Sequence, residues 1–315
     1  MKEIKLSVVI PVYDEVSTVS ACLTDIVETL AQSSLSFEIV AVNDGSQDGT
    51  EEALLALLER YPDHLRVASH VRNKGMGAAL RTGTRLARGE IVVWMDADGQ
   101  HKATDILKLI EQIPPYDMVI GARTSSYEGA WYRNIANRFY NWFASWLTES
   151  PILDLTSGFR AMRRSAALHF LPLFPAGFSS STTITLAMLK AGYSIIFVPI
   201  NVQPRTQGKS KITLFKDGRR FVLIILRMIM LFDPLRVFLP VTLVLFILGV
   251  VTWIVGIIAA SRPVVPGSTV VLFIAAILSM LLGLVSTQIS NALIAYHGDE
   301  FVYLHEKQDT SPDAS

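Results

Sequence analysis

The chain has 315 residues, half of them hydrophobic, and its 28 basic residues balance 28 acidic ones, so the formal net charge is zero. This length allows one sizeable core and an additional segment, and no nucleic-acid partner is expected. Cys22 is the single cysteine of the sequence, which excludes an internal disulfide and fits a reducing compartment.

The first half of the chain alternates short apolar runs with segments of helical period. The runs predict strands at Leu6–Val12, Phe37–Val42, Leu65–Ser69, Ile91–Met95 and Asp117–Ile120. The periodic segments predict helices at Ala21–Leu30, Glu51–Leu58, Ala78–Ala87 and Asp105–Ile113. Repeated strand-helix-strand units predict an α/β fold with a mostly parallel, Rossmann-like sheet covered by helices.

Polar clusters follow four of the predicted strands. They are Tyr13-Asp14-Glu15, Asn43-Asp44-Gly45-Ser46, Asn73-Lys74-Gly75 and Asp96-Ala97-Asp98. Each cluster alone could be turn chemistry or a helix N-cap, for which Ser46 and Asp48 are suited. Because the carboxyl ends of parallel strands share one edge, where ligands bind, we predict that the clusters form one site.

The cluster after the fourth strand carries the most chemistry. Asp96 and Asp98 are two residues apart, so strand alternation puts both carboxylates on one side. Such oxygens suit a divalent cation that bridges a diphosphate, as a nucleotide-sugar site requires. A plain turn after a strand would also accept Asp and Gly, and the rest of the chain has to decide between the two readings.

A dinucleotide-binding dehydrogenase is a further reading of the third cluster. Gly75-Met76-Gly77 is similar to part of the dinucleotide fingerprint, but Leu80 occupies the third glycine position and the motif follows the third strand. We therefore expect Gly75 to permit a tight turn.

Two long segments near the end of the sequence contain no charged residue. They run from Val237 to Ala260 and from Pro263 to Tyr296, and each exceeds the roughly 20 residues that a membrane-spanning helix needs. A buried helix of a soluble protein is a poor alternative for uncharged segments of this length.

The charges around these segments predict the orientation of the chain. Eight Lys or Arg lie between Arg205 and Arg236, whereas Arg262 is the single one in the connection 261–268. By the positive-inside rule the N-terminal part and both termini face the cytoplasm, which makes the chain a multi-pass protein of the cell membrane. No signal peptide is expected, because the first apolar run is short and is followed by Asp14 and Glu15.

These motifs together resemble a known family. The segments Val9-Ile10-Pro11-Val12-Tyr13-Asp14-Glu15, Val42-Asn43-Asp44-Gly45-Ser46, Asn73-Lys74-Gly75 and Met95-Asp96-Ala97-Asp98-Gly99-Gln100-His101 resemble family 2 glycosyltransferases. The branch is that of dolichol-phosphate mannosyltransferases and polyprenyl-phosphate glycosyltransferases. The resemblance runs from about Leu6 to Lys211, and the two apolar segments are similar to the anchor of membrane-bound members.

The resemblance implies a fold, an activity and partners. The fold is glycosyltransferase A-type, and the activity is inverting transfer of a single sugar from a GDP- or UDP-linked donor to polyprenyl phosphate, with Mg²⁺ or Mn²⁺ as cofactor. The expected organisation is a cytoplasmic catalytic domain at 1–211, an interfacial amphipathic helix at 212–234, a two-helix membrane anchor at 235–297 and a tail at 298–315.

It also implies roles for individual residues. The donor would be bound by Pro11, Tyr13, Glu15, Asp44, Lys74, Gly75, Asp96, Ala97, Asp98 and Gln100, with Asp44 accepting from the base. The metal would be surrounded by Asp96, Asp98 and Gln100, and the catalytic residues would be Asp98, Arg123, Arg133 and Arg205. The acceptor phosphate would be held by Arg133, Asn137, Arg138, Ser157, Arg205 and Lys211, where Ser157-Gly158-Phe159-Arg160 and Gly208-Lys209-Ser210-Lys211 match family signatures. For any one of these arginines, exposure to water without a function is the alternative.

Four positions depart from the family pattern, which commonly has Asn, Pro, Ser and Glu there. They are Asp14, Lys102, Asn137 and Thr183, in that order. Asn137 preserves a hydrogen-bond donor, so we keep the reaction class. Thr183 stands where many family members have a carboxylate near the sugar site, so the identity of the sugar stays undetermined.

The expected chemistry needs no strong base. A lipid phosphate is already anionic at neutral pH, which explains why no Ser-His-Asp or Cys-His set stands out. A metal at Asp96 and Asp98 would neutralise the leaving nucleoside diphosphate, and arginines would offset the repulsion between the two substrates.

Three further segments have two readings each. Thr213 to Phe232 predicts a basic amphipathic helix on the membrane surface, or a core helix with a basic edge. Trp131 to Leu147 predicts an aromatic helix that guides the isoprenoid tail, or ordinary core packing. The stripe of Ala275, Ser279 and Gly283 permits close helix approach within one chain or in a homo-oligomer.

Other functions make distinguishable predictions. A processive polysaccharide synthase would have more membrane helices and a Gln-x-x-Arg-Trp motif, and the sequence contains no Arg-Trp pair. A nucleotide-binding membrane scaffold would bind the donor without consuming it. A subunit of a lipid flippase would need a hydrophilic path, which two uncharged helices hardly provide.

Overall fold

The structure is a computed structural model, and it describes residues 4–123, 138, 141–142, 144–146, 148–173, 180–203, 230 and 233–295. Four of the predicted site residues lie outside this part of the chain, namely Arg133, Asn137, Arg205 and Lys211. The predicted interfacial helix at 212–234 lies almost entirely outside it, and so does the tail at 298–315.

Seven strands of the described part form one mixed sheet in the order β3-β2-β1-β4-β6-β5-β7. They are β1 (Leu6–Val12), β2 (Phe37–Asn43), β3 (Leu65–Ser69), β4 (Ile91–Trp94), β5 (Met118–Arg123), β6 (Arg160–Arg163) and β7 (Ile195–Ile200). The five predicted strands are confirmed with small shifts at their ends. Strand β6 is antiparallel to both of its neighbours, while the other neighbouring pairs are parallel.

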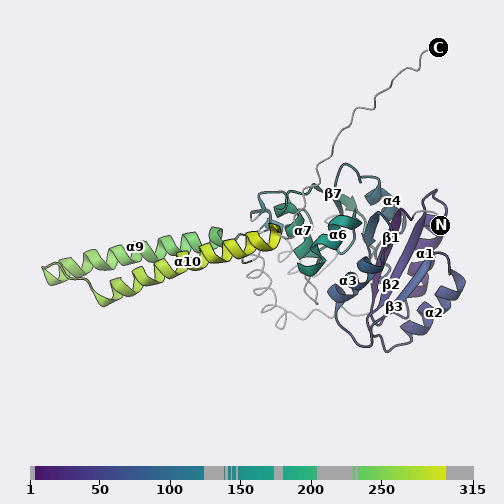
Figure 1. Cartoon of the computed structure of the whole chain (residues 1–315), viewed down its shortest axis with the longest axis horizontal. Helices are drawn as coiled ribbons and strands as arrows, with labels where there is room; N and C mark the ends of the chain where they lie inside the picture. Colours follow the sequence, from purple (N-terminus) through teal and green to yellow (C-terminus); the bar gives the residue numbers. More distant parts are fainter. Residues whose placement is uncertain are drawn as a thin grey trace, which may run out of the picture.

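Helices cover both faces of the sheet (Figure 1). One apolar layer contains α1 (Val19–Ala31), α2 (Thr50–Arg60) and α4 (Thr104–Ile110). The other contains α3 (Met76–Leu86), α6 (Arg164–Phe170) and α7 (Ser180–Lys190), and η1 (Leu171–Leu173) follows α6. Alternate residues of β1 pack on opposite faces of the sheet: Val8 and Ile10 lie in the first apolar layer, and Val9 lies in the second.

Strand β6 determines which loops meet at the carboxyl edge of the sheet. Its first residue, Arg160, pairs with Trp94 of β4 and Ile120 of β5. Because β6 runs against its neighbours, the segment before it enters at the edge where β1, β2, β4 and β5 end. Residues 154–159 therefore join the polar loops that the sequence places there.

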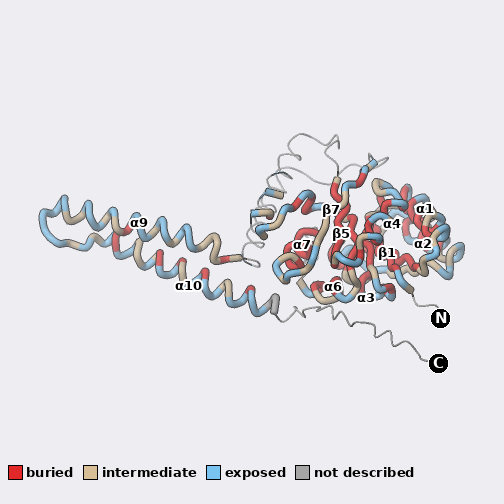
Figure 2. The backbone as a smooth tube through the Cα atoms, turned by 90° about the horizontal axis from the view of Figure 1, so that it is seen from above, coloured by how far each residue is buried: buried red, intermediate tan, exposed pale blue. Residues whose placement is uncertain are grey.

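Two long helices project from the α/β domain as a hairpin (Figure 1). Both α9 (Pro234–Ala260) and α10 (Gly267–Ala295) are long and apolar enough to cross a membrane, with mean hydropathies of 2.8 and 2.6. Apart from their contact with each other, most of their surface is exposed, in contrast to the buried interior of the sheet (Figure 2). Such exposed apolar helices suit a lipid environment.

The two helices pack closely at small residues. A Cβ on Gly249 would meet the Phe273 ring at 2.8 Å, and one on Gly283 would meet Phe238 at 2.8 Å. The Thr252 and Thr269 hydroxyls lie 3.0 Å apart across the same contact. Gly283 and Ser279 thus face α9 in one chain, which is the first of the two readings of the small-residue stripe.

Candidate active site

A buried carboxylate lies at the end of β2. The side chain of Asp44 is 3% exposed and accepts hydrogen bonds from His70 Nδ1 at 2.6 Å, Lys74 N at 3.0 Å and Gly75 N at 2.7 Å. His70 Nε2 lies 2.9 Å from Thr82 Oγ1. Asp44 thus joins the loop after β2 to the loop before α3, as the convergence of polar clusters predicts.

The loops after β1 and β2 are tied to each other. Asp14 N donates to Ser46 Oγ at 3.0 Å, and Asp14 Oδ1 accepts from Gln47 N at 3.1 Å. Asp14 has φ 53°, a left-handed conformation that Asn and Asp tolerate better than most residues. This backbone explains why Asp can stand where the family commonly has Asn.

Helix α2 begins without the predicted side-chain N-cap. Gly49 occupies the N-cap position. Asp48 still contributes, because its Oδ1 accepts the Thr50 N–H at 3.1 Å and its Oδ2 accepts Val16 N–H at 3.2 Å. Burial tends to raise the pKa of this carboxyl, but the hydrogen bonds outweigh that effect and lower it. Asp48 therefore stays ionised and fixes the two loops.

The D-x-D loop follows β4 directly. Asp98 is 9% exposed and its Oδ1 accepts the Gln100 N–H at 3.1 Å across Gly99, which has φ +70°. Gln100 is bound twice to the segment after β7: its Nε2 donates to Gln203 O at 3.2 Å, and its O accepts from Gln203 N at 2.9 Å. These contacts fix the loop at the sheet edge.

Cys22, in α1, packs against the main chain of the D-x-D loop. Its Sγ lies 3.9 Å from Asp96 O. Burial raises the pKa of the thiol to about 12, and the charge of Asp98 adds to the effect. The thiol is thus neutral at physiological pH.

Two further residues pack beside the D-x-D loop. A Cβ on Gly158 would lie 3.1 Å from Asp96 Oδ2, so glycine at this position avoids a close contact with that oxygen. His101 stacks on Phe159 with ring centroids 4.8 Å apart. Burial lowers the pKa of His101 and outweighs the opposing charge of Asp98, so the imidazole is neutral.

The donor set fits a hard divalent cation. Asp96 and Asp98 offer carboxylate oxygens, and Gln100 offers an amide oxygen. The neutral thiol of Cys22 contacts the main-chain carbonyl of Asp96 instead. Mg²⁺ and Mn²⁺ accept such a set when water and phosphate complete the coordination. In the described residues no group of three or more His, Cys, Asp or Glu could hold a metal by itself. A cation here would therefore depend on the ligand's own oxygens.

Arg123, at the end of β5, forms a bidentate pair with Asp154. Arg123 Nε and Nη2 lie 2.7 and 2.9 Å from the two carboxylate oxygens, and Nη2 also donates to Thr156 Oγ1 at 2.6 Å. Burial tends to raise the pKa of Asp154, but Arg123 outweighs this effect and lowers it. The structure places Arg123 at the predicted edge and gives it a carboxylate partner that the sequence did not indicate.

Ser157, which the family signature predicts at the acceptor phosphate, forms a hydrogen bond within the domain, and its contact with a phosphate stays a prediction. Its hydroxyl is buried and donates to Gly121 O at 2.6 Å. A serine hydroxyl has one proton, so this geometry favours a structural role over a bond donated to a phosphate.

Arg160 is fully buried at the start of β6. Its Nη1 donates to Ser181 O at 2.8 Å and to Thr185 Oγ1 at 2.9 Å, and its Nη2 donates to Ser157 O. Burial lowers the pKa of the guanidinium to about 9, and nearby Asp154 opposes the shift. Arg160 is thus still charged at neutral pH and ties the loop before β6 to α7.

Comparison with known proteins decides the family. The model of "Glycosyl transferase family 2" matches residues 7–170, more than half of the chain. The chain belongs to glycosyl transferase family 2. The model of the "GtrB C-terminal hairpin" matches residues 233–292, which comprise nearly all of α9 and α10. The resemblance drawn from the motifs is thereby confirmed.

Two relatives of this family 2 chain are named for the reactions that they catalyse. It is 29% identical over 216 residues to the undecaprenyl-phosphate 4-deoxy-4-formamido-L-arabinose transferase of Sodalis glossinidius, covering 69% of this chain and 65% of that protein. The chain thus spans just under two thirds of the length of this relative. It is also 29% identical to the polyprenol monophosphomannose synthase of Mycolicibacterium smegmatis, covering 65% of this chain and 80% of that protein.

A solved structure shares the fold of the family 2 domain. Glucosyl-3-phosphoglycerate synthase from Mycobacterium tuberculosis, in complex with Mn²⁺, uridine diphosphate and glucosyl-3-phosphoglycerate, superposes with a TM-score of 0.55. Its sequence identity is 21%, and the match covers 70% of this chain and 78% of that one. The predicted glycosyltransferase A-type architecture is confirmed at the level of the fold.

The remaining predicted donor residues lie on the same loops of the family 2 domain. Tyr13 is 37% exposed at the end of β1, Glu15 Oε2 accepts from Thr18 Oγ1 at 2.9 Å, and Ala97 is buried. Pro11 is partly buried within β1. Arg138 is helical and exposed, and its contact with an acceptor stays a prediction.

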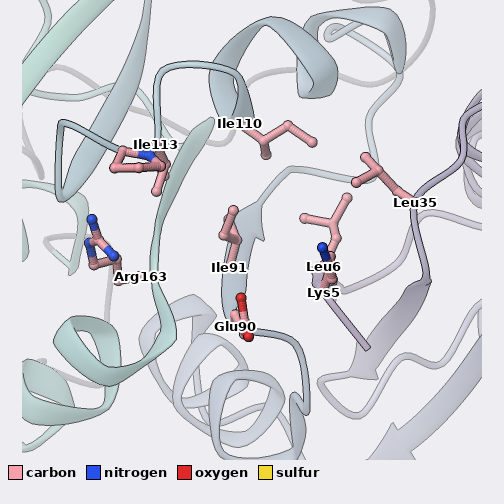
Figure 3. Close-up of a pocket in the computed structure, with 9 residues that line it drawn as sticks. Lys5, Leu6, Leu35, Glu90, Ile91, Ile110, Ile113 and Arg163 are labelled. Carbon is pink, nitrogen blue, oxygen red and sulfur yellow. The ribbon is translucent and has the colours of Figure 1, made fainter. Parts of the chain in front are cut away.

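One cavity lies away from this site. It has a volume of about 240 Å³ and lies at the starts of β1 and β4, beside Leu6, Ile91 and Arg163 (Figure 3). Arg163 ends the antiparallel strand β6, which places the cavity at the amino edge of the sheet. The cavity is therefore distinct from the D-x-D loop.

Proposed function

We propose that the chain is a membrane-anchored glycosyltransferase that transfers one sugar from a nucleotide-sugar to polyprenyl phosphate. The observation that carries the proposal is that the D-x-D loop and the buried Asp44 lie at the same edge of the sheet, in a chain that continues into an apolar hairpin. The names of the relatives support polyprenyl phosphate as the acceptor.

Each part of the site has a task in this reaction. Asp44 would bind the base, which would place the diphosphate beside Asp96 and Asp98. These two carboxylates, with Gln100, would hold Mg²⁺ or Mn²⁺, as the Mn²⁺ in the related fold supports. When bound, the cation would neutralise charge on the leaving nucleoside diphosphate.

The acceptor needs to be positioned more than activated. Its phosphate oxygen is anionic at neutral pH and would attack the anomeric carbon from the side opposite the leaving group, which inverts that centre. Arg123 lies at this edge, and the predicted contacts of Arg133, Arg138 and Arg205 would add positive charge against the repulsion of two phosphates. The neutral His101 and the buried Cys22 would support the loop without taking a proton.

The hairpin would keep the site at the level of the lipid head groups. We place the catalytic domain on the cytoplasmic face, because basic residues are concentrated before α9 and Arg262 alone lies in the connection between the helices.

The test is a transfer assay with the full chain in detergent, undecaprenyl phosphate, Mn²⁺ or Mg²⁺, and UDP- and GDP-linked sugars. Mass spectrometry should show one sugar-phosphate-lipid product, and Asp98→Asn should lower the rate at least about a hundredfold because it removes a charged ligand. Asp63→Asn, at an exposed position before β3, is the matched control. Absence of product with every donor, or equal rates for Asp98→Asn and wild type, would contradict the proposal. Donor binding without turnover would favour the membrane scaffold.

A further inference from the structure

The hydrogen bonds of Asp44 limit what its carboxylate can still accept. An ionised carboxylate has about four acceptor positions, two on each oxygen. Oδ1 accepts from His70 Nδ1 and Lys74 N, and Oδ2 accepts from Gly75 N. No other donor to Asp44 occurs among the residues that the structure describes. Oδ1 is therefore saturated, and one position remains on Oδ2.

The His70 ring is fixed from both sides. A carboxylate only accepts, so Nδ1 must carry the proton that His70 shares with Asp44. Nε2 lies 2.9 Å from the Thr82 hydroxyl, which holds the other side of the ring. The side chain of His70 is 8% exposed, so water does not readily replace it. His70 therefore occupies one acceptor position of Oδ1 permanently.

The carboxylate has little room to turn. A Cβ on Gly45, which has φ +73°, would lie 2.6 Å from the main-chain carbon of Arg72, so the loop after β2 packs directly on the loop before α3. Both main-chain donors to Asp44 belong to this second loop. The remaining position on Oδ2 is thus presented in one fixed direction.

The bases of the two nucleotides expected from the sequence differ in the hydrogen-bond donors that they present to a carboxylate. Uracil presents one ring N–H between two carbonyl oxygens. Guanine presents a ring N–H beside an amino N–H, a pair that engages both oxygens of a carboxylate. With Oδ1 saturated, guanine would bury one donor without a partner, and such a loss is costly. Exposed Arg72 and Lys74, in the same loop, offer cationic donors suited to carbonyl oxygens.

We infer that the donor is a uridine diphosphate sugar rather than a guanosine diphosphate sugar, and that His70 is the positioning residue that sets this preference by saturating Asp44 Oδ1. The inference rests on the proposed function, because it assigns the base to Asp44. It goes beyond that proposal by choosing the nucleotide.

The test measures binding of UDP and of GDP separately, by calorimetry on the full chain in detergent with Mn²⁺. Wild type should bind UDP at least about tenfold more tightly than GDP, the consequence of one unmade hydrogen bond. His70→Leu, which has similar bulk but no donor, should bring the two affinities together. His70→Asn, whose amide nitrogen can donate near the position of Nδ1, should keep the preference and also controls for folding.

The outcomes separate the two claims. Equal or tighter binding of GDP by wild type overturns the uridine assignment while leaving a glycosyltransferase intact. An unchanged preference in His70→Leu overturns the role of His70. Failure of the wild-type chain to bind either nucleotide overturns this inference and the proposed function together.

Discussion

The side chains around the D-x-D loop divide into those that face the ligand edge and those that hold the loop. Asp98 and Gln100 are joined to each other and to Gln203, whereas Cys22 lies beneath Asp96 and is buried among carboxylates. A thiol in this position contributes packing and a weak hydrogen bond. Burial is the main reason that its pKa is raised, and ionisation would also place a further negative charge beside Asp98 and Asp96.

Cys22 should consequently be almost inert to alkylation in the folded protein. With a pKa of about 12, the thiolate is scarce at pH 8 and the thiol is also sterically covered. We expect iodoacetamide to leave the native chain unmodified over hours and to label it fully in denaturant. Mass spectrometry reads this directly, because the sequence has one cysteine. Rapid stoichiometric labelling of native protein at pH 8 would show that the loop opens or that the thiol is ionised.

Prediction from sequence succeeded at single residues where the determining contact is local. The apolar run before Asp96 and Asp98 predicts a strand that ends just before them, and in the structure the two residues follow β4. The partners that were missed are distant in the chain: His70 lies 26 residues from Asp44, and Asp154 lies 31 from Arg123. The motif of Ser157 indicated its location but could not show that its proton is donated to a main-chain carbonyl.

At the scale of elements, the strands that were found and those that were missed differ in composition. Strands β1 and β2 are almost continuously apolar, as strands buried on both faces should be. Strand β6 has the sequence Arg-Ala-Met-Arg, and its buried arginine gives no strand signal. Its antiparallel direction depends on the whole topology, so the residue pattern did not show how residues 154–159 reach this edge, and only the family resemblance placed Ser157 there.

A buried polar network at the opposite edge of the sheet joins several elements. Glu38 of β2 is 2% exposed and accepts from Ser7 Oγ at 2.7 Å, Arg88 N at 2.6 Å and Arg66 Nη1 at 3.2 Å. All three donors would be left without a carboxylate if Glu38 were truncated. The network lies at the starts of β1 and β4, far from the D-x-D loop.

Glu38→Ala should therefore lower stability without changing chemistry. We expect a loss of about 2–4 kcal/mol in the free energy of unfolding, because buried donors lose a charged acceptor. Transfer activity per folded molecule should stay within about twofold of wild type. Denaturant unfolding followed by fluorescence measures the first quantity, with Glu28→Ala on the exposed side of α1 as the control. A large loss of specific activity at full stability would show that the two edges are coupled.

At the scale of the whole molecule, the hairpin is attached to the catalytic domain at the start of α9. Arg236, in the first turn of α9, lies 3.3 Å from Glu149 and stacks 4.3 Å over the Trp146 ring. Asp233, the N-cap of α9, lies near Lys190 at the end of α7; burial lowers the pKa of Lys190, and Asp233 opposes the shift. These contacts join α9 to two separate parts of the domain, so in a bilayer crossed by α9 they would set the height of the proposed site.

Arg236→Ala should consequently impair reaction at the membrane more than nucleotide binding. The ion pair with the exposed Glu149 contributes little by itself, and the stacking on Trp146 carries most of the contact. We expect transfer to undecaprenyl phosphate in liposomes to fall about threefold to tenfold, which is the loss of roughly 1 kcal/mol of positioning. The affinity for nucleotide, whose proposed contacts lie at the end of β2 and the start of α3, should be unchanged. Arg262→Ala, in the connection at the other end of the hairpin, is the matched control. Equal transfer rates for the two variants would mean that the domain is held at the membrane by contacts other than this one, and a parallel loss of nucleotide affinity would mean that Arg236 acts through the folding of the domain.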